Sequence, residues 1–247
     1  MPDLPEPIPA ATLIVMRDGP GAPELLMVER AAQLAFAGGA LVFPGGRIDP
    51  GDVALAIALG DPMLAPRVAA IRETIEEVGL AVGLEPVPDP VTTAAMRVRL
   101  HAGETFGDVL GGHRVAAEWL VPFARWQPER LVARLLDTHF FLAAAPREAP
   151  TPTEDGTETV RAFWASARQV LDDAAAGRAQ LIFPTRRVLE RLATLPSFDA
   201  AAAHAEAYPV RTITPWVERR GGIDQLCIPD DLGYPVTAEP LDQAVRR

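Results

Sequence analysis

The stretch FPGGRIDPGD (residues 43–52) is followed, twenty residues further on, by RETIEEVGL (residues 72–80). The first stretch is typical of a strand that runs into a glycine turn. The second is typical of a short helix that carries three glutamates and ends at a glycine. Together they raise the question of which chemistry needs a glycine turn beside a cluster of carboxylates.

The helix predicted over residues 67–78 has two different sides. At about 100° per residue, one side is apolar and the other carries carboxylates. The apolar residues are Val68, Ile71, Ile75 and Val78, and the carboxylates are Glu73, Glu76 and Glu77. Negative charge in the last turns opposes the helix macrodipole, and carboxylates four residues apart repel each other. Folding alone would therefore favour Lys or Arg at these positions.

Two interpretations of this acidic side stay open at this point. It could be a solvated face, with Arg72 pairing with Glu76 one turn on. Alternatively, all three carboxylates could bind a hard divalent cation such as Mg²⁺, which takes oxygen ligands. The glycine turn favours the cation. Gly45 and Gly46 are predicted to adopt backbone conformations closed to other residues, which would bring a main-chain carbonyl or amide to the metal or substrate. Asp52 is predicted to begin a helix as its N-cap.

The two stretches resemble the signature of the Nudix hydrolases: a glycine, five residues, a glutamate, seven residues, then Arg-Glu-x-x-Glu-Glu-x-Gly. Gly46 stands at the first glycine, and Arg72, Glu73, Glu76, Glu77 and Gly79 match the second half in full. Asp52 replaces the first glutamate, and 19 residues instead of seven separate it from Arg72. An insertion over about residues 53–66 is therefore expected. Similar insertions occur in a Nudix subgroup that resembles acyl-CoA diphosphatases.

The resemblance implies both a fold and a reaction. The fold would be α/β (α+β), a Nudix-like α/β/α sandwich with a mixed central sheet. The reaction would be hydrolysis of a nucleoside diphosphate linked to another moiety, by attack of water at phosphorus with Mg²⁺ or Mn²⁺ as cofactor. Glu73, Glu76 and Glu77 would hold the metal beside the backbone of Gly45 or Gly46. Arg72 would orient a glutamate.

The segment LLMVERAAQLAFAGGALVFPGG (residues 25–46) resembles the one that precedes the Nudix box in coenzyme A diphosphatases, and Arg30 matches its arginine. A guanidinium suits a phosphate, although an ordinary edge-strand ion pair with Glu29 or a neighbouring residue is the alternative. Phe43, Arg47 and Asp52 are further candidates for substrate binding. Glu158, in the acidic loop over residues 151–159, is a candidate general base, with a solvated loop as the alternative.

The expected substrate is therefore the diphosphate of CoA or an acyl-CoA. A hydrolase of ADP-ribose, NADH or dinucleotides is the alternative within the same class. A catalytically inactive Nudix-fold module that binds a ligand is the alternative from another class. Intact Glu73, Glu76 and Glu77 argue against the inactive module.

Composition excludes several other functions. A net charge of −10 argues against binding to nucleic acid or an anionic membrane. All 23 basic residues are arginine, which removes Schiff-base chemistry and the phosphate-loop lysine. Cys227 is the only cysteine, so neither an intrachain disulfide nor a thiolate metal site is expected. The apolar run ATLIVM near the N-terminus is too short for a signal or a membrane span, and a cytoplasmic location is expected.

The chain is expected to form one Nudix domain over residues 1–195, with a helical segment over about residues 91–118. Composition shifts after Pro196, and residues 196–247 are expected to be an extension that packs on the same domain. Gly221-Gly222, between two β-like runs, predicts a hairpin there. The extension leaves a homodimer open.

Overall fold

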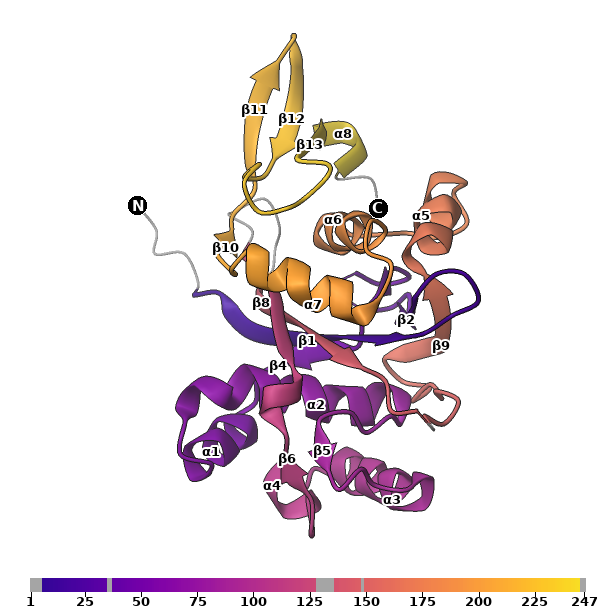
Figure 1. Cartoon of the computed structure of the whole chain (residues 1–247), viewed down its shortest axis with the longest axis vertical. Coiled ribbons are helices and arrows are strands. Elements are labelled where there is room, and N and C mark those ends of the chain that lie inside the picture. The colour runs from indigo at the N-terminus through magenta and orange to yellow at the C-terminus, as the bar shows by residue number, and fades with distance from the viewer. Residues whose placement is uncertain (1–5, 35–36, 128–135, 148, 245–247) are drawn as a thin grey trace.

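The computed structural model describes residues 6–34, 37–127, 136–147 and 149–244. It is an α/β/α sandwich, with helices on both faces of a mixed sheet (Figure 1). Within the described residues the strand order is β10-β7-β8-β1-β2-β3, with β4 paired to β1 and β9 paired to β2. The strands are β1 (Ile8–Arg17), β2 (Glu24–Arg30), β3 (Leu41–Val42), β4 (Gly45–Arg47), β7 (Val121–Trp126), β8 (Leu136–Ala144), β9 (Thr159–Ser166) and β10 (Thr212–Ile213). The predicted sandwich and mixed sheet are confirmed.

Strand β1 lies in the middle of the sheet and is buried on both faces. It runs parallel to β8, from Ile8 opposite Leu136 to Met16 opposite Ala144. Because side chains alternate along a strand, Leu13 contributes to the core on one face and Ile14 to the core on the other. This double burial accounts for the continuous apolar run in the sequence.

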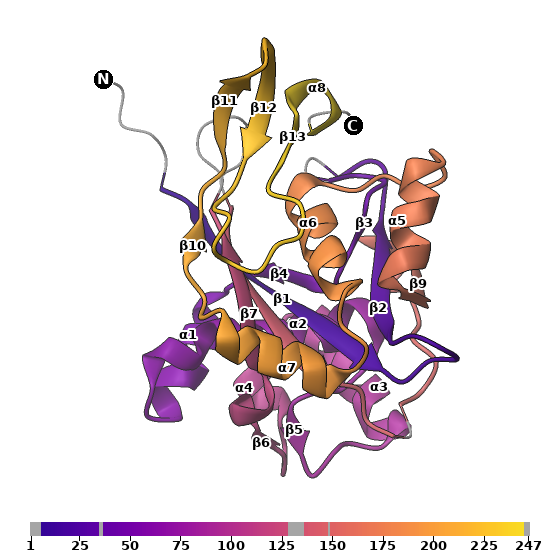
Figure 2. The ribbon, with the colours of Figure 1, turned by 45° about the horizontal axis from the view of Figure 1, so that its top comes forward.

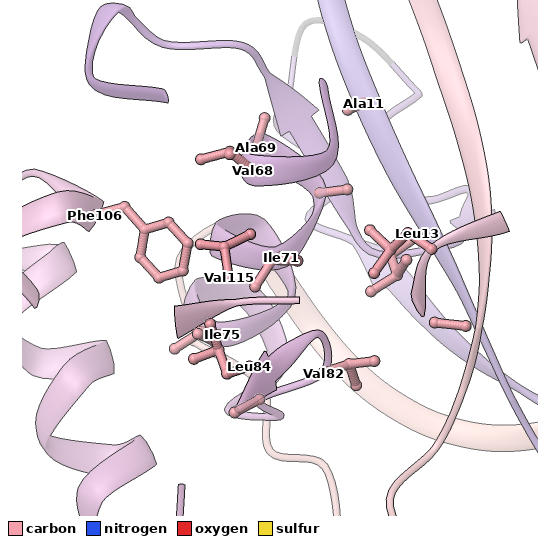
Figure 3. Close-up of a cluster of buried hydrophobic side chains, with 14 of the residues drawn as sticks. Ala11, Leu13, Val68, Ala69, Ile71, Ile75, Val82, Leu84, Phe106 and Val115 are labelled. Carbon is pink, nitrogen blue, oxygen red and sulfur yellow. The ribbon is translucent and has the colours of Figure 1, made fainter. Parts of the chain in front are cut away.

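Different helices cover the two faces of the sheet (Figure 2). On one face lie α1 (Pro50–Ala58), α2 (Ala65–Val78), α3 (Pro90–His101) and α4 (Phe106–Val109), and on the other lie α5 (Ala167–Ala175), α6 (Phe183–Leu192) and α7 (Phe198–Ala207). The predicted apolar side of α2 is confirmed, since its four residues are fully buried. Figure 3 shows three of them, Val68, Ile71 and Ile75, between Phe106 and Leu13. Helix α2 ends at Gly79, whose φ of 65° is left-handed, as its position as a cap predicts.

The helical segment expected over about residues 91–118 is interrupted. Helix α3 ends at His101, and Gly103 (φ 87°) turns the chain before the short α4. The segment continues as strand β6 (Arg114–Val115), paired with β5 (Leu84–Glu85), and the 3₁₀ turn η2 (Ala117–Trp119). The insertion expected over residues 53–66 forms the rest of α1, the 3₁₀ turn η1 (Pro62–Leu64) and the start of α2.

The prediction that Asp52 is an N-cap is wrong. Asp49 is the N-cap of α1, and Pro50 follows it at the first helical position, which proline favours. Asp52 occupies the third helical position, and its Oδ2 accepts the Asp49 N–H at 2.8 Å. This bond is the half of a capping box in which the side chain at the third helical position accepts the N-cap N–H.

The C-terminal segment contributes to the core on the α6 and α7 side, through residues that include Ala201, Ile213, Leu226 and Tyr234. Strands β11 (Trp216–Arg220) and β12 (Ile223–Cys227) form the hairpin predicted at Gly221-Gly222, and both glycines have positive φ. The segment ends with β13 (Ala238–Pro240) and α8 (Leu241–Ala244). No helix in the described ranges is long and apolar enough to cross a lipid bilayer.

A buried ion pair ties this segment to α6. The Arg187 guanidinium, 2% exposed, lies 2.9 Å from Glu190 Oε1 and 2.8 Å from Glu239 Oε2 on β13. Removing Glu239 takes one hydrogen-bonded carboxylate from Arg187 and leaves it paired with Glu190. We expect Glu239→Ala to lower the free energy of unfolding by about 2 kcal/mol in urea denaturation, the loss typical of a hydrogen bond to a charged group. Glu218→Ala, which breaks an exposed pair with Arg220, should leave it unchanged; equal losses in the two variants would contradict this account.

Candidate active site

A cavity of about 640 Å³ lies where β4, α2 and the acidic loop meet β7, β8 and the start of α6. One part of its wall is apolar and comes from residues such as Val42, Phe43, Trp126, Phe140, Ile182 and Pro184. The polar part has six carboxylates but only three guanidinium groups among the described residues. The carboxylates are Asp49, Glu73, Glu76, Glu77, Asp155 and Glu158, and the guanidiniums are Arg30, Arg47 and Arg72. The cavity therefore has an excess of negative charge.

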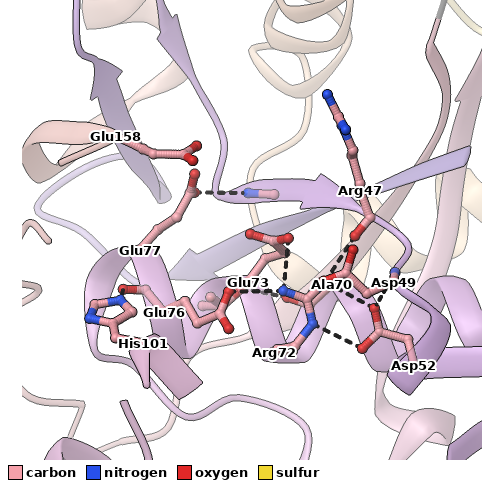
Figure 4. Close-up of polar contacts among 12 residues, drawn as sticks. Arg47, Asp49, Asp52, Ala70, Arg72, Glu73, Glu76, Glu77, His101 and Glu158 are labelled. Atoms are coloured by element: carbon pink, nitrogen blue, oxygen red, sulfur yellow. Dashed lines mark hydrogen bonds and ion pairs between the residues drawn. The ribbon is translucent and has the colours of Figure 1, made fainter. Parts of the chain in front are cut away.

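Arg72 lies at the centre of the polar network (Figure 4). Its Nε and Nη2 donate to the two Asp52 carboxylate oxygens at 2.9 Å each, and Nη2 also donates to the Arg47 carbonyl at 2.9 Å. Nη1 lies 2.8 Å from Glu76 Oε2 and 2.9 Å from Glu73 Oε1. Burial alone would lower the pKa of Arg72, but these carboxylates outweigh burial and raise it. Arg72 therefore stays charged and orients two of the three glutamates.

Glu77 is the most buried of the three glutamates. Its Oε2 accepts the Gly45 N–H at 3.0 Å, and its Oε1 lies 3.6 Å from Arg30 Nη1. Burial, reinforced by the neighbouring Glu73 charge, raises the pKa of Glu77 to about 8. Burial also raises the pKa of Glu73 to about 7, although Arg72 opposes that shift. These carboxylates lack enough positive charge to hold them ionised near neutral pH, as expected of a site built for a cation.

Arg30 lies beside both Glu77 and Glu158. Arg30 Nη2 lies 3.5 Å from Glu158 Oε2, and the two residues line the cavity together. Glu29 pairs with Arg161 at 3.2 Å instead, so the alternative pair between Arg30 and Glu29 is not formed. The loop that carries Glu158 is shaped by Asp155, whose Oδ1 accepts the backbone N–H groups of residues 157–159.

Comparison with known proteins decides the family. Residues 7–184 match the family model described as the NUDIX domain. The chain belongs to the Nudix family. A NUDIX hydrolase from Alicyclobacillus acidocaldarius shares 28% identity and a TM-score of 0.71, over 81% of this chain and 97% of that one. A MutT NUDIX hydrolase from Burkholderia pseudomallei shares 16% identity and a TM-score of 0.45, over 75% of this chain and 98% of that one. A search of curated proteins finds no match.

This Nudix protein is therefore a pyrophosphohydrolase that acts on small molecules. Nudix hydrolases generally use divalent metal ions. No group of three His, Cys, Asp or Glu side chains within the described ranges is already arranged to hold one. Arg72 contacts both Glu73 and Glu76, so a metal would have to share them with the guanidinium. The donors still fit a hard cation, because Glu73 and Glu77 offer buried oxygens of raised pKa beside the backbone of β4.

The role of the two glycines in this Nudix hydrolase differs from the one predicted. Neither Gly45 nor Gly46 has positive φ, and both lie in β4, paired with Thr12 and Ala11. What they provide is space. A Cβ on Gly46 would lie 2.3 Å from Glu73 Oε1, and a Cβ on Gly45 would lie 2.5 Å from the Ala11 carbonyl oxygen. Glycine is needed at position 46 because β4 approaches the carboxylate helix closely, and at position 45 because β4 approaches β1 closely.

Gly46→Ala should therefore displace the Glu73 carboxylate without unfolding the Nudix domain. We expect kcat to fall about tenfold or more, since shifts in the groups around a metal site commonly have this cost. Gly112→Ala is the matched control, because a Cβ there meets nothing within 4 Å. Steady-state kinetics of the two variants would check this, and wild-type turnover by Gly46→Ala would refute the close-approach explanation.

The remaining predicted substrate-binding residues lie in different places. Phe43 and Arg47 line the cavity, although Phe43 is itself buried and the Arg47 side chain points away from the carboxylates (Figure 4). Asp52 does not line the cavity: its side chain is 0% exposed and both of its oxygens accept from Arg72. The prediction that Asp52 contacts substrate is therefore wrong. In the structure its carboxylate holds the Arg72 guanidinium instead.

Two residues of α3 near the site were not predicted. His101 lines the cavity, with its Nε2 3.2 Å from the Glu76 carbonyl. Arg97 Nε donates to the same carbonyl at 2.8 Å. A signal for such a cation was present in the sequence, because three carboxylates crowd a helix C-terminus whose last turn contains no basic residue. The sequence does not indicate which arginine would supply the charge.

Proposed function

We propose that this Nudix hydrolase cleaves the diphosphate of CoA or of an acyl-CoA, and that it requires Mg²⁺ or Mn²⁺. The observation that carries the proposal is the cavity itself, in which six carboxylates and three guanidiniums adjoin an apolar wall. A diphosphate is an anion and would be repelled from this surface unless a divalent cation accompanied it. The resemblance of residues 25–46 to the segment of coenzyme A diphosphatases supports the choice of substrate.

Each part of the site has a role in this reaction. Glu73, Glu76 and Glu77 would hold the metal beside Gly45 and Gly46, and the metal would supply charge neutralisation at the diphosphate oxygens and acidify a water. Arg30 binds a phosphate oxygen, since its Nε is buried without a partner among the described residues. Glu158 takes a proton from the attacking water. The water oxygen bonds to phosphorus, the anhydride P–O bond breaks, and two monophosphates leave.

The apolar wall also supports a second substrate class. Trp126 and Phe140 could pack on a nucleotide base as readily as on an aliphatic arm. Hydrolysis of ADP-ribose, NADH or dinucleotides is therefore the second candidate. An inactive binding module is the third, and intact carboxylates in the cavity weigh against it.

A panel assay separates these candidates. The protein is incubated with Mg²⁺ and CoA, an acyl-CoA, NADH, ADP-ribose or a diadenosine compound, and monophosphate products are measured. The proposal expects the highest kcat/KM with CoA or acyl-CoA, and loss of activity in chelator. Preference for ADP-ribose, NADH or the dinucleotide would overturn the choice of substrate. Ligand binding without turnover of any compound would favour the binding module.

Three further proposals rest on the sequence and on the position of the C-terminal segment. The catalytic domain comprises residues 1–195, and residues 196–247 are an extension of it. The extension forms the interface of a homodimer, which sedimentation of the full-length wild type and of Ile223→Asp, a substitution at an exposed apolar residue of the hairpin, would test. The protein acts in the cytoplasm.

A further inference from the structure

Negative charge accumulates at the C-terminus of α2, and an arginine of α3 offsets it. Three glutamates lie in its last two turns, where the helix dipole is already negative, and its last turn has no basic residue. Arg97, on α3, donates from Nε to the Glu76 carbonyl at 2.8 Å and from Nη2 to the Glu77 carbonyl at 2.9 Å. One guanidinium therefore satisfies two terminal carbonyls and places a positive charge at the helix end.

The same guanidinium reaches the loop that carries Glu158. Arg97 Nη1 donates to Thr153 Oγ1 at 2.9 Å, and the Thr153 N–H donates to the Val78 carbonyl at 3.0 Å. Gly79 lies between these groups, and a Cβ on it would be 3.2 Å from Arg97 Nη1 and 3.3 Å from Thr153 Oγ1. Arg97, Thr153 and the end of α2 thus form one connected unit, which we call the Arg97 clamp.

The clamp joins two parts of the active site that are far apart in the sequence. Glu77 lies at the end of α2, and Glu158 lies five residues beyond Thr153 on the loop. Arg30 lies between the two carboxylates, 3.6 Å from Glu77 and 3.5 Å from Glu158. Arg97 itself does not line the cavity, so it does not contact a ligand there.

We infer that Arg97 is a positioning residue that sets the placement of Glu158 relative to Glu77. The inference rests on the proposed function, in which Glu77 holds the metal and Glu158 accepts the proton. One arm of the clamp, to the carbonyls of Glu76 and Glu77, fixes the metal side. The other arm, to Thr153, fixes the loop of the general base.

Arg97→Met tests both arms, since methionine keeps much of the side-chain length and removes every donor. We expect about a tenfold fall in kcat with KM nearly unchanged, and about a tenfold weaker Mg²⁺ affinity by calorimetry. Arg97→Lys, which keeps a charge but not the fork of donors, should recover part of both losses. Arg99→Met is the matched control: it lies on the same helix and pairs with the exposed Glu104, so both quantities should stay at wild-type values.

Thr153→Val separates the arms, because it removes only the hydroxyl that accepts from Nη1. It should lower kcat several-fold and leave Mg²⁺ affinity unchanged, whereas Thr153→Ser should restore kcat. If Arg97→Met lowers only the melting temperature, with kcat and Mg²⁺ affinity at wild-type values, Arg97 is merely structural and the inference fails. If the wild-type protein cleaves no compound, the proposed function fails, and the Mg²⁺ titrations still test the arm to α2.

Discussion

Glu77→Gln is expected to lower kcat by about 10³-fold, since loss of a proposed metal-binding carboxylate should cost more than the roughly 10–100-fold typical of residues that only support such ligands. The amide keeps the size of the side chain and an acceptor for the Gly45 N–H, so only the charge is lost. The same variant should be more stable than the wild type in metal-free buffer at pH 8. The reason is that burial raises the pKa of Glu77 to about 8, which makes its ionised form costly in the folded state.

Kinetics and thermal unfolding in chelator measure the two effects on one preparation. Glu118→Gln is the control, because Glu118 pairs with Arg114 on the surface and lies outside the cavity. If Glu77→Gln loses activity and is also more stable than the wild type without metal, the charge of Glu77 serves the reaction and destabilises the fold. Full turnover by Glu77→Gln would remove Glu77 from the proposed metal ligands.

Arg72→Met is expected to have the largest combined effect on stability and activity. It leaves the Asp52 carboxylate buried without its cation, and breaking a buried pair in this way costs about 3–5 kcal/mol in free energy of unfolding. It also releases Glu73 and Glu76 from their common donor, so kcat should fall by about 10²-fold. Urea denaturation and steady-state kinetics measure these changes.

The double variant Asp52→Asn/Arg72→Met tests the cause of the loss of stability. If the unpaired Asp52 charge is responsible, the neutral amide should recover part of the free energy of unfolding but none of the turnover. A double variant no more stable than Arg72→Met would show that the loss has another origin, such as the contact between Arg72 and the Arg47 carbonyl.

The sequence predicted the parts of the site that depend on local geometry. The two sides of α2 follow from the helical period, and contacts between Arg72 and Glu76 are contacts between neighbours on one helix. The left-handed Gly79 follows from its place after the last turn. These features could be found because they involve residues within one or two turns of each other.

The features that were missed depend on tertiary structure. Arg97 reaches Glu76 across 21 residues of sequence, and no local pattern selects it over the other arginines. The N-cap prediction at Asp52 is wrong because Asp49 followed by Pro50 is the stronger signal for a helix start. Gly45 and Gly46 were expected to have unusual backbone angles, whereas the structure requires their lack of a side chain. That requirement appears only when β4 is packed against both β1 and α2.

We propose that the excess carboxylate charge of the cavity serves to bind a divalent cation. Without metal, the raised pKa values of Glu73, about 7, and Glu77, about 8, mean that the folded state binds protons more tightly than the unfolded chain. The free energy of unfolding should therefore fall as pH rises from about 4.5 to 8, and protons should compete with metal over the same range.

Calorimetric titration with Mg²⁺ and with Mn²⁺ at pH 6 and pH 8 measures this binding. We expect a metal affinity that is higher at pH 8, protons released on binding at pH 6, and loss of both in Glu77→Gln. Absence of binding by either metal at both pH values, even with a non-hydrolysable diphosphate present, would show that these carboxylates hold no divalent cation.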